Sequence, residues 1–530
     1  MNNSLPSFTR REFIGSGLFL TAAGLWLPRL CLATLPTDNP LLQPGAGWSQ
    51  LLPWQPVIDI TSIPGAGEFW DERLEKAQQA LLPKGGGTIF FPRGNYRFAR
   101  DILLQSGVIL RGVPSEVPSA HDARFAPASK LEFPGYAPSF SGSGTPVSTA
   151  FKGITLSDPA EASNCGVAFL DINRGHISLG ETQGHRCGIN RFVYGCRLRN
   201  CAGPASEIPD LKQGQPAWLR YTAKFRAAIR VHAAENALVA NNRIPKSGDD
   251  NFTLRGYPLK DRKGQAVPFD VEFDYDNRPG IYVNHHCIGG AGASGDDGTP
   301  ETHPWGFREG TIIRDNYVYC TGRCAIGFSG DGVVCSRNVI RFAQAVSRPT
   351  VTGVEASHGS STNDNRAVEM RGWRWVLEGN DYEVHSNICS DGKYRINDGE
   401  GLMHEDHCNS SVVGSRLVNN HGNSYLSIYH CGAIDGLHIE GNEISTPGRI
   451  SDIYVAAPRH RQPGDFPIRR VTIVNNVTRS NGIRVRGHPA ERVVVKGNRH
   501  ASTTTGVIFD EANAEVSNNS NYEVKVPSPI

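Results

Sequence analysis

The sequence has little net charge, and this excludes one large class of partners. Its 54 Lys and Arg residues nearly balance its 52 Asp and Glu residues, which leaves a formal charge of +2 over 530 residues. Residues 1–33 hold three arginines and one glutamate, so the rest of the chain is formally neutral. Proteins that bind nucleic acid usually carry a basic surface. We therefore expect no nucleic-acid partner.

The sequence also lacks a cysteine framework and, near its start, an apolar run of membrane length. Eleven of the twelve cysteines follow residue 33, an odd number, and no pair recurs with zinc-ribbon spacing. We expect Cys196, Cys320, Cys324 and Cys335 to be small apolar fillers in strands or turns, and we expect no structural metal. The apolar stretch Gly17–Leu27 is too short to span a bilayer.

The first 33 residues resemble an export signal. Paired arginines in Thr9–Ile14 precede the apolar stretch, which ends at Pro28. This order resembles a bacterial twin-arginine signal peptide, with Leu32–Ala33 as the cleavage point. We expect a periplasmic or secreted protein that is monomeric and does not associate with the membrane once the signal is removed.

A short apolar strand followed by an asparagine recurs along the C-terminal half. The units that fit are Val239–Asn242, Ile313–Asn316, Cys335–Asn338, Leu377–Asn380, Ile439–Asn442, Ile473–Asn476, Val495–Asn498 and Val516–Asn519. In Val413–Arg416 the asparagine is missing. Repetition at tens of residues predicts a solenoid, in which each unit buries its apolar face against the next. We expect each asparagine to occupy a left-handed turn and to bond the same amide one coil above.

A second strand accompanies each unit, with apolar residues at its second and fourth positions. Examples are Ala228–Val231, Gly280–Val283, Ala325–Phe328, Ala367–Met370, Gly401–His404, Tyr425–Ile428, Asp452–Val455, Gly482–Val485 and Gly506–Phe509. The last four begin 27, 30 and 24 residues apart, which suits coils of three short strands. Few Asn-Gly turns occur, so stacked antiparallel hairpins are disfavoured. The sequence therefore predicts an all-β protein, a right-handed parallel β-helix.

The region around residues 57–112 carries a family resemblance. A helix is predicted over Phe69–Leu82, followed by the glycine turn and strands of Gly85–Phe98 and then by Val108–Gly112. This arrangement resembles the start of the pectate lyase-like β-helix superfamily, whose members begin with a helix that caps the first coil. We therefore divide the chain into a signal (1–33), a linker (34–56), a cap with the first strands (57–112) and the β-helix (113–530).

Long insertions fall in the central coils. The spacing of the second strand decreases from 52 residues, between Ile229 and Ile281, to 24 residues, between Leu402 and Leu426. The excess must leave the coils as loops, which we expect near 203–227, 245–279, 288–309, 343–366 and 386–400. Surface loops on a rigid scaffold concentrate binding and catalysis. A groove flanked by these loops would suit an extended polymer.

The outward positions of the second strand supply the candidate catalytic residues. Ionisable groups gather there where the loops are longest: Glu369, Arg371, Glu405, Asp406 and His407. Adjacent coils stack about 4.8 Å apart. The carboxylates of Glu369 and Glu405 could therefore lie roughly 5–6 Å apart, which suits a retaining glycosidase. Asp406 could replace either one.

The same groups allow a lyase. Uronate elimination needs the sugar carboxylate to be neutralised, by calcium, Arg or protonated His, and needs a base for the C5 proton. Arg371, His407, Tyr429 or His430 could supply these functions. Calcium is possible at Asp249–Asp250 and Asp296–Asp297, although ordinary acidic turns are the simpler interpretation.

The sequence thus predicts an exported enzyme that cleaves glycosidic bonds of a polysaccharide, as a glycoside hydrolase or a polysaccharide lyase. Substrate-binding candidates are Tyr282, His285, His286, Tyr429 and His430. The superfamily resemblance also covers epimerases and adhesion modules, since a fold does not fix a function. The alternative is a non-catalytic carbohydrate-binding or surface structural protein.

Overall fold

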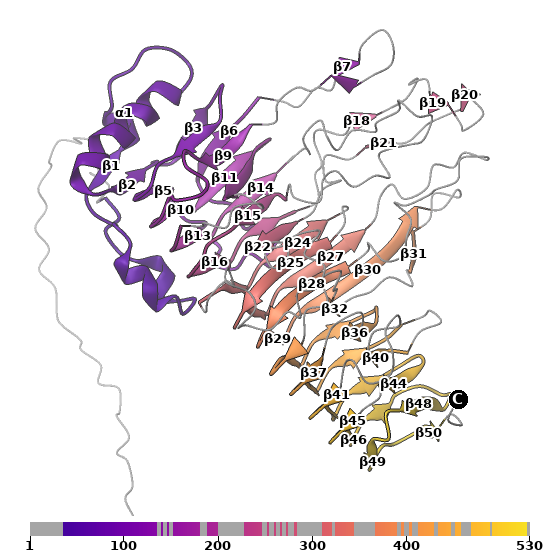
Figure 1. Cartoon of the computed structure of the whole chain (residues 1–530). Helices are drawn as coiled ribbons and strands as arrows, with labels where there is room; N and C mark the ends of the chain where they lie inside the picture. The colour runs from indigo at the N-terminus through magenta and orange to yellow at the C-terminus, as the bar shows by residue number, and fades with distance from the viewer. Residues whose placement is uncertain are drawn as a thin grey trace, which may run out of the picture. The chain divides into compact units, whose positions relative to one another are not determined.

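Three long parallel sheets form the body of the protein in a computed structural model (Figure 1). The structure describes residues 35–134, 139–140, 146–147, 152–180, 188–199, 227–245, 252–253, 259–260, 266–267, 272–273, 280–283, 310–320, 324–343, 366–388, 394–396, 402–404, 412–428, 433–446, 451–456, 468–487 and 490–526.

We name the three sheets A, B and C, and the chain visits them in turn. Sheet A contains, in order, β1 (Val57–Asp59), β2 (Gly87–Phe90), β5 (Val108–Arg111), β10 (Cys165–Ala168), β13 (Arg191–Tyr194), β16 (Ala237–Ala240), β23 (Ile312–Arg314), β26 (Val334–Ser336), β29 (Val376–Glu378), β34 (Arg416–Val418), β38 (His438–Glu440), β42 (Thr472–Val474), β46 (Val494–Lys496) and β49 (Glu515–Ser517).

Sheet B contains β3 (Gly94–Arg97), β6 (Ser129–Glu132), β11 (Leu170–Asn173), β14 (Arg197–Arg199), β17 (Arg243–Ile244), β24 (Tyr317–Cys320), β27 (Val339–Ala343), β30 (Asp381–Ile388), β35 (His421–Gly422), β39 (Glu443–Ile444), β43 (Val477–Thr478) and β47 (Arg499–His500). Its extra strand, β31 (Tyr394–Ile396), pairs antiparallel with β30.

Sheet C contains β4 (Ile102–Leu104), β9 (Gly153–Leu156), β12 (His176–Leu179), β15 (Ile229–Val231), β22 (Ile281–Val283), β25 (Cys324–Asp331), β28 (Arg366–Trp373), β32 (Leu402–His404), β36 (Leu426–Ile428), β40 (Ile453–Ala456), β44 (Gly482–Arg486), β48 (Gly506–Glu511) and β50 (Tyr522–Lys525).

Within each sheet every strand pairs in parallel with its counterpart one coil later, so the fold is the predicted right-handed parallel β-helix. A fourth, short parallel sheet joins the later coils: β33 (Val412–Val413), β37 (Ile434–Asp435), β41 (Ile468–Arg469) and β45 (Ala490–Glu491). Three antiparallel pairs stand apart: β7 (Ser139–Phe140) with β8 (Pro146–Val147), β18 (Phe252–Thr253) with β21 (Glu272–Phe273), and β19 (Leu259–Lys260) with β20 (Ala266–Val267).

The predicted capping helix is present as α1 (Asp71–Leu81). It buries Leu74, Ala77, Gln78 and Leu81 in the same core as the first strands. Gln78 also donates through Nε2 to the carbonyl of Leu103 and accepts from the amide of Gln105, at 3.1 and 3.0 Å. The helix thus covers apolar side chains and satisfies backbone groups of the first coil.

Residues 35–56, which we expected to be a linker, pack against sheet A. They form two 3-10 helices, η1 (Pro40–Leu42) and η2 (Gly47–Leu51). Trp54 is buried against Phe192, with ring centroids 5.7 Å apart, and its indole donates to the carbonyl of Ser49. Arg111 donates to both the carbonyl and the carboxylate of Asp38. The stretch is therefore folded.

The asparagine ladder is confirmed and is longer than predicted. Along Asn242, Asn316, Asn338, Asn380, Asn420, Asn442, Asn476, Asn498 and Asn519, each Nδ2 donates to the next Oδ1 at 2.9–3.1 Å. The expected break at Val413–Arg416 was wrong, because Leu417–Asn420 is the unit and Asn420 continues the ladder. The residue before each ladder asparagine takes the positive φ instead, for example Asn241 and Asp315.

The core lies between the three sheets, and the predicted inward residues of the second strand are buried. Ile229, Val231, Ile281, Val283, Ile326, Phe328, Val368, Met370, Leu426, Ile428, Ile453, Val455, Ile483 and Val485 are all fully buried. The last coil was predicted one residue out of register. Ile508 pairs with Ile483 and Asp510 with Val485, so Val507 and Phe509 do not point inward. The Asp510 carboxylate fits there because it accepts from the amides of Ala512 and Ala514.

The three cysteines that the structure assigns as free, Cys165, Cys196 and Cys335, are buried as apolar fillers. Burial raises the pKa of Cys165 and of Cys196 to about 12. The backbone of Cys320 lies in β24, and that of Cys324 lies in β25. In the described part of the chain, no helix has the length and apolar character needed to cross a membrane.

Candidate functional site

The long connections of the chain flank sheet C. The corner between sheets A and B is tight, since only two residues separate β23 from β24 or β29 from β30, and the ladder occupies that corner. Apart from residues 112–128, which join β5 to β6, the long insertions lie at the other two corners. Residues 200–228, 245–280, 344–365 and 389–401 precede strands of sheet C, whereas 284–311, 405–411 and 457–467 follow them. Strands of sheet C thus have long connections at both of their ends.

The strand register aligns one row of outward positions across sheet C. Tyr282 pairs with Gly327, which pairs with Glu369, and the row continues through Met403, Ser427, Tyr454 and Arg484. These positions alternate with buried core residues, such as Ile281 and Val283 beside Tyr282 and Val368 and Met370 beside Glu369. Along this row Gly327 has no side chain and Ser427 is fully buried, whereas Tyr454 and Arg484 are partly exposed.

The predicted catalytic residues fall into two groups. Glu369 and Arg371 lie on β28, two positions apart and therefore on the same face of the strand. Glu405, Asp406 and His407 follow β32, the next strand of sheet C, and lie outside the described residues. Glu369 is in register with Met403, two positions before Glu405. The carboxylate separation that we expected for Glu369 and Glu405 stays a prediction.

The predicted substrate-binding residues are less fully placed. Tyr282 lies at the centre of β22 in the outward row. His285, His286, Tyr429 and His430 lie outside the described residues. Their predicted role stays a prediction, although the first two follow β22 and the last two follow β36 in sheet C.

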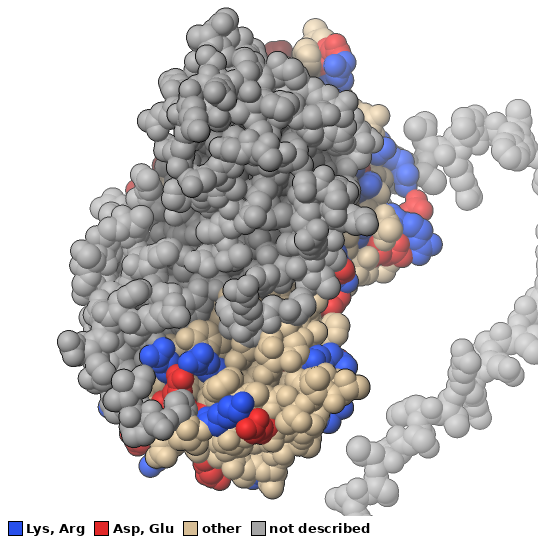
Figure 2. All heavy atoms as spheres, turned by 90° about the vertical axis from the view of Figure 1, so that its right-hand side faces the viewer, with Lys and Arg blue, Asp and Glu red and all other residues tan. Residues whose placement is uncertain are grey.

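The C-terminal end of the same row carries a charged cluster. Arg484 donates through Nη2 to Glu511 Oε1 at 2.6 Å, and its guanidinium lies 5.6 Å from the ring centroid of Phe509. Arg486 lies 3.4 Å from the other Glu511 oxygen. In Figure 2 basic and acidic side chains lie close together on the visible part of this end. In these contacts the Glu511 carboxylate faces the guanidinium groups of Arg484 and Arg486. In the row, Tyr454 of β40 lies between Arg484 of β44 and Ser427 of β36, on the side towards β28.

Sequence reasoning missed a second line of ionisable groups, on the outer face of sheet B. Arg341 binds Asp381 at 2.7 Å and lies 3.5 Å from Glu383, and His421 lies 3.1 Å from the other Asp381 oxygen. Partial burial would raise the pKa of Asp381, but the hydrogen bonds with Arg341 and His421 outweigh it and lower that pKa. Ionisable residues directly after some ladder asparagines, such as Asp381 and His421, were the available signal.

A deeper ion pair lies nearer the N-terminal end of sheet B. Asp171 is 1% exposed, and its carboxylate accepts from Arg199 Nε at 2.8 Å while Arg197 Nη1 lies 3.8 Å away. Both guanidinium groups thus form ion pairs with this buried carboxylate within the sheet. We assign it a structural role.

Metal binding finds no support among the residues that the structure describes, where no group of three or more His, Cys, Asp or Glu side chains comes together. Asp249–Asp250 and Asp296–Asp297 lie outside those residues, so the possible calcium site stays a prediction.

No family model and no curated protein matches the chain. Solved structures with a similar backbone fold include PfbA, a surface adhesin of Streptococcus pneumoniae. It matches at 10% identity over 88% of this chain and 90% of that chain, with a TM-score of 0.40. The catalytic unit of a GH87 α-1,3-glucanase from Streptomyces thermodiastaticus matches at 11% identity over 89% and 70%, with a TM-score of 0.35.

The A-module of the mannuronan C-5 epimerase AlgE6 from Azotobacter vinelandii matches at 10% identity over 89% of this chain and 100% of that module, with a TM-score of 0.30. At such low identity these likenesses concern the fold alone.

Proposed function

We propose that this protein is an exported enzyme that cleaves glycosidic bonds of a polysaccharide bound along the outer face of sheet C. One observation carries the proposal: the register of sheet C aligns Tyr282, Glu369 and Tyr454 in one row, at positions that alternate with buried core residues, on a sheet whose strands have long connections at both ends. Aromatic rings can stack on sugar faces and a carboxylate can act as acid, base or nucleophile, so the row contains both binding and reactive groups.

Each proposed catalytic residue has a defined task. In hydrolysis, one of Glu369 and Glu405 protonates the leaving oxygen and the other attacks the anomeric carbon or activates water. In elimination, Arg371 or His407 neutralises the sugar carboxylate, and a base, Tyr429 or His430, removes the C5 proton as the bond to the leaving oxygen breaks. Asp406 is the substitute acid in either reaction.

The test is a panel of acidic and neutral polysaccharides incubated with the mature chain. Absorbance of the unsaturated uronate product and new reducing ends are followed together. A rise in both identifies a lyase, and new reducing ends alone identify a hydrolase. Neither signal, combined with measurable polysaccharide binding, would reject the enzyme and leave the non-catalytic carbohydrate-binding protein.

Variants then locate the site. We expect Glu369→Gln to lower kcat by about 100-fold or more, the usual contribution of a general acid or base. Glu378→Gln is the matched control, because Glu378 lies on the next strand of the same coil, exposed on sheet A. Full activity in both Glu369→Gln and Glu405→Gln would show that the reaction takes place elsewhere.

A further inference from the structure

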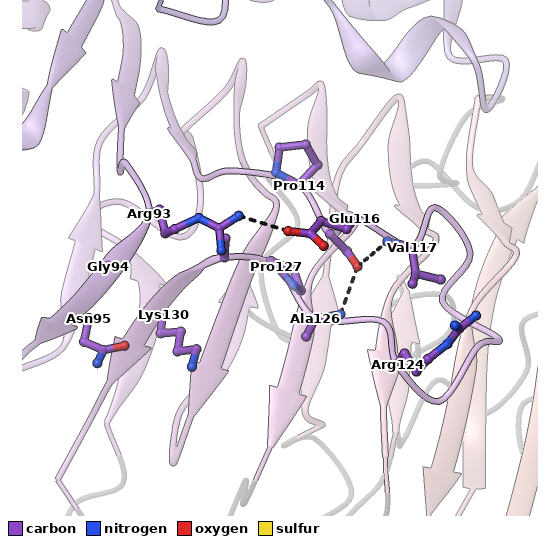
Figure 3. A pocket seen from close by; sticks show the side chains of 12 residues that line it. Arg93, Gly94, Asn95, Pro114, Glu116, Val117, Arg124, Ala126, Pro127 and Lys130 are labelled. Atoms are coloured by element: carbon purple, nitrogen blue, oxygen red, sulfur yellow. Dashed lines mark hydrogen bonds and ion pairs between the residues drawn. The ribbon is translucent and has the colours of Figure 1, made fainter. Parts of the chain in front are cut away.

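A pocket of about 560 Å³ lies on the outer face of sheet B at its N-terminal end, on β3 and β6 (Figure 3). Gly94 and Asn95 of β3 and Lys130 of β6 line it, and Asn95 and Lys130 are direct register partners. The segment 114–128 forms its other wall. The pocket lies on a different sheet from the row of Glu369, and nothing above assigns it a role.

The wall of the pocket is held in place by hydrogen bonds. Ser115 Oγ accepts from the amides of Val117 and Ala126, at 3.1 and 3.0 Å (Figure 3). Further along, Arg243 Nη1 donates to the carbonyl of Ala120 at 2.8 Å, and the amide of Ala120 donates to Asn241 at 2.8 Å. A ligand would therefore meet a preformed wall and would lose little binding energy in ordering it.

The charges of the pocket leave one cation without a carboxylate. Arg93 lies 3.2 Å from Glu116, and Arg124 binds Asp122 at 2.7 Å. The hydrogen bonds from Arg124 lower the pKa of Asp122 to about 2, so that pair stays charged and compensated at neutral pH. No described carboxylate forms an ion pair with Lys130, which lies exposed beside the Asn95 amide. The pocket therefore has a net charge of about one positive unit, located on its floor.

We propose that this pocket binds an acidic sugar unit, with its carboxylate on the Lys130 ammonium and a ring hydroxyl on the Asn95 amide. Pro114, Val117 and Pro127 give the wall an apolar surface against which the C–H face of a pyranose ring can pack. A neutral sugar would leave the ammonium without an anionic partner, so the pocket should select uronates. Binding at this pocket does not require catalysis on sheet C, so it can be tested independently of the proposed function.

The experiment measures how fast an amine-acylating reagent modifies Lys130 in the full chain, by peptide mass spectrometry. The probes are oligogalacturonate and a neutral oligogalactoside, both added to Glu369→Gln so that turnover does not consume them. We expect oligogalacturonate to slow acylation of Lys130 at least fivefold and the neutral oligomer to leave it unchanged. Lys496, also exposed on a strand but on sheet A, is the internal reference and should react at an unchanged rate.

Binding of the same probes by calorimetry gives the second readout. Lys130→Gln should weaken oligogalacturonate binding at the pocket about tenfold, as expected for a lost hydrogen bond to a charged group, whereas Lys496→Gln should not. The proposal is overturned if oligogalacturonate leaves Lys130 unprotected, if the neutral oligomer protects it equally, or if sodium acetate at the same concentration protects it as well as the sugar.

Discussion

At the scale of single residues, the ladder asparagines are the side chains on which the fold depends most. Asn380 is 1% exposed and uses its whole amide. It donates to the carbonyl of Cys335 and to Asn420 Oδ1, and its own oxygen accepts from the amide and the side chain of Asn338. Four bonds thus meet at one buried group, where any missing partner leaves a desolvated polar atom.

We expect Asn380→Ala to lower the free energy of unfolding by about 3–5 kcal/mol, because it leaves several buried polar groups without partners. Asn519→Ala is the matched control, since Asn519 ends the ladder, is only partly buried and leaves fewer groups behind. The decrease in the free energy of unfolding in Asn519→Ala should be less than half of that in Asn380→Ala. Urea denaturation followed by circular dichroism measures both, and equal losses would contradict a cooperative ladder.

At the scale of elements, the segment 35–56 illustrates how packing gives order to a stretch with no periodic pattern. Its buried residues Leu41, Ala46, Leu52 and Trp54 share a small apolar core with Phe192 of β13 and Leu238 of β16. That core lies on the outer side of sheet A, because Phe192 and Leu238 are register partners facing away from Val193 and Val239. The segment therefore covers a sheet face that would otherwise expose apolar side chains.

We expect Trp54→Ala to release this segment, since truncating a buried Trp costs about 3–5 kcal/mol. The indole also loses its bond to the Ser49 carbonyl. Limited proteolysis should cut the variant within residues 35–56 at protease concentrations that leave the wild type intact. Leu51→Ala serves as the control because Leu51 is 72% exposed. Equal resistance of wild type and Trp54→Ala would indicate that the segment does not depend on this core.

The elements that could be predicted from the sequence are those whose signal repeats. The ladder asparagines recur on successive coils from Asn242 to Asn519, and inward pairs such as Ile229 and Val231 recur along sheet C, so a local pattern specifies them. The error at Val413–Arg416 arose because two apolar runs, 412–413 and 417–418, compete for one strand, and only pairing with β29 selects the second. The pocket at Lys130 carries no repeat and depends on the fold of the segment 114–128, so it could not be predicted.

The candidate site was predictable only in part for the same reason. Alternation predicted that Tyr282 and Glu369 share one row of sheet C, and in the strand register both pair with Gly327. Alternation in the second strand gave no information on the charged line of sheet B through Arg341, Asp381 and His421, because those residues lie on a different strand of each coil. Side-chain positions beyond the strand ends follow from loop geometry, which periodicity does not encode.

At the scale of the whole molecule, a solenoid needs protection at the end where its first coil would be open. Helix α1 provides it, with Leu74, Ala77 and Leu81 in the common core. The Asp71 carboxylate accepts from the amides of Ala99 and Arg100, which fixes the start of the helix to the first coil. An uncovered parallel edge is a template for pairing with another chain, so the cap also limits association.

We therefore expect Leu74→Asp to shift the protein towards larger species and to lower its melting temperature, because a carboxylate cannot be buried in this core without a partner. Leu74 is 2% exposed. Gln79→Asp is the matched control, since it places the same side chain on the exposed face of the same helix. Light scattering and thermal unfolding measure both variants. If Leu74→Asp keeps the size and melting temperature of Gln79→Asp, the helix is dispensable and the first coil must be protected by residues 35–56 or by its own strands.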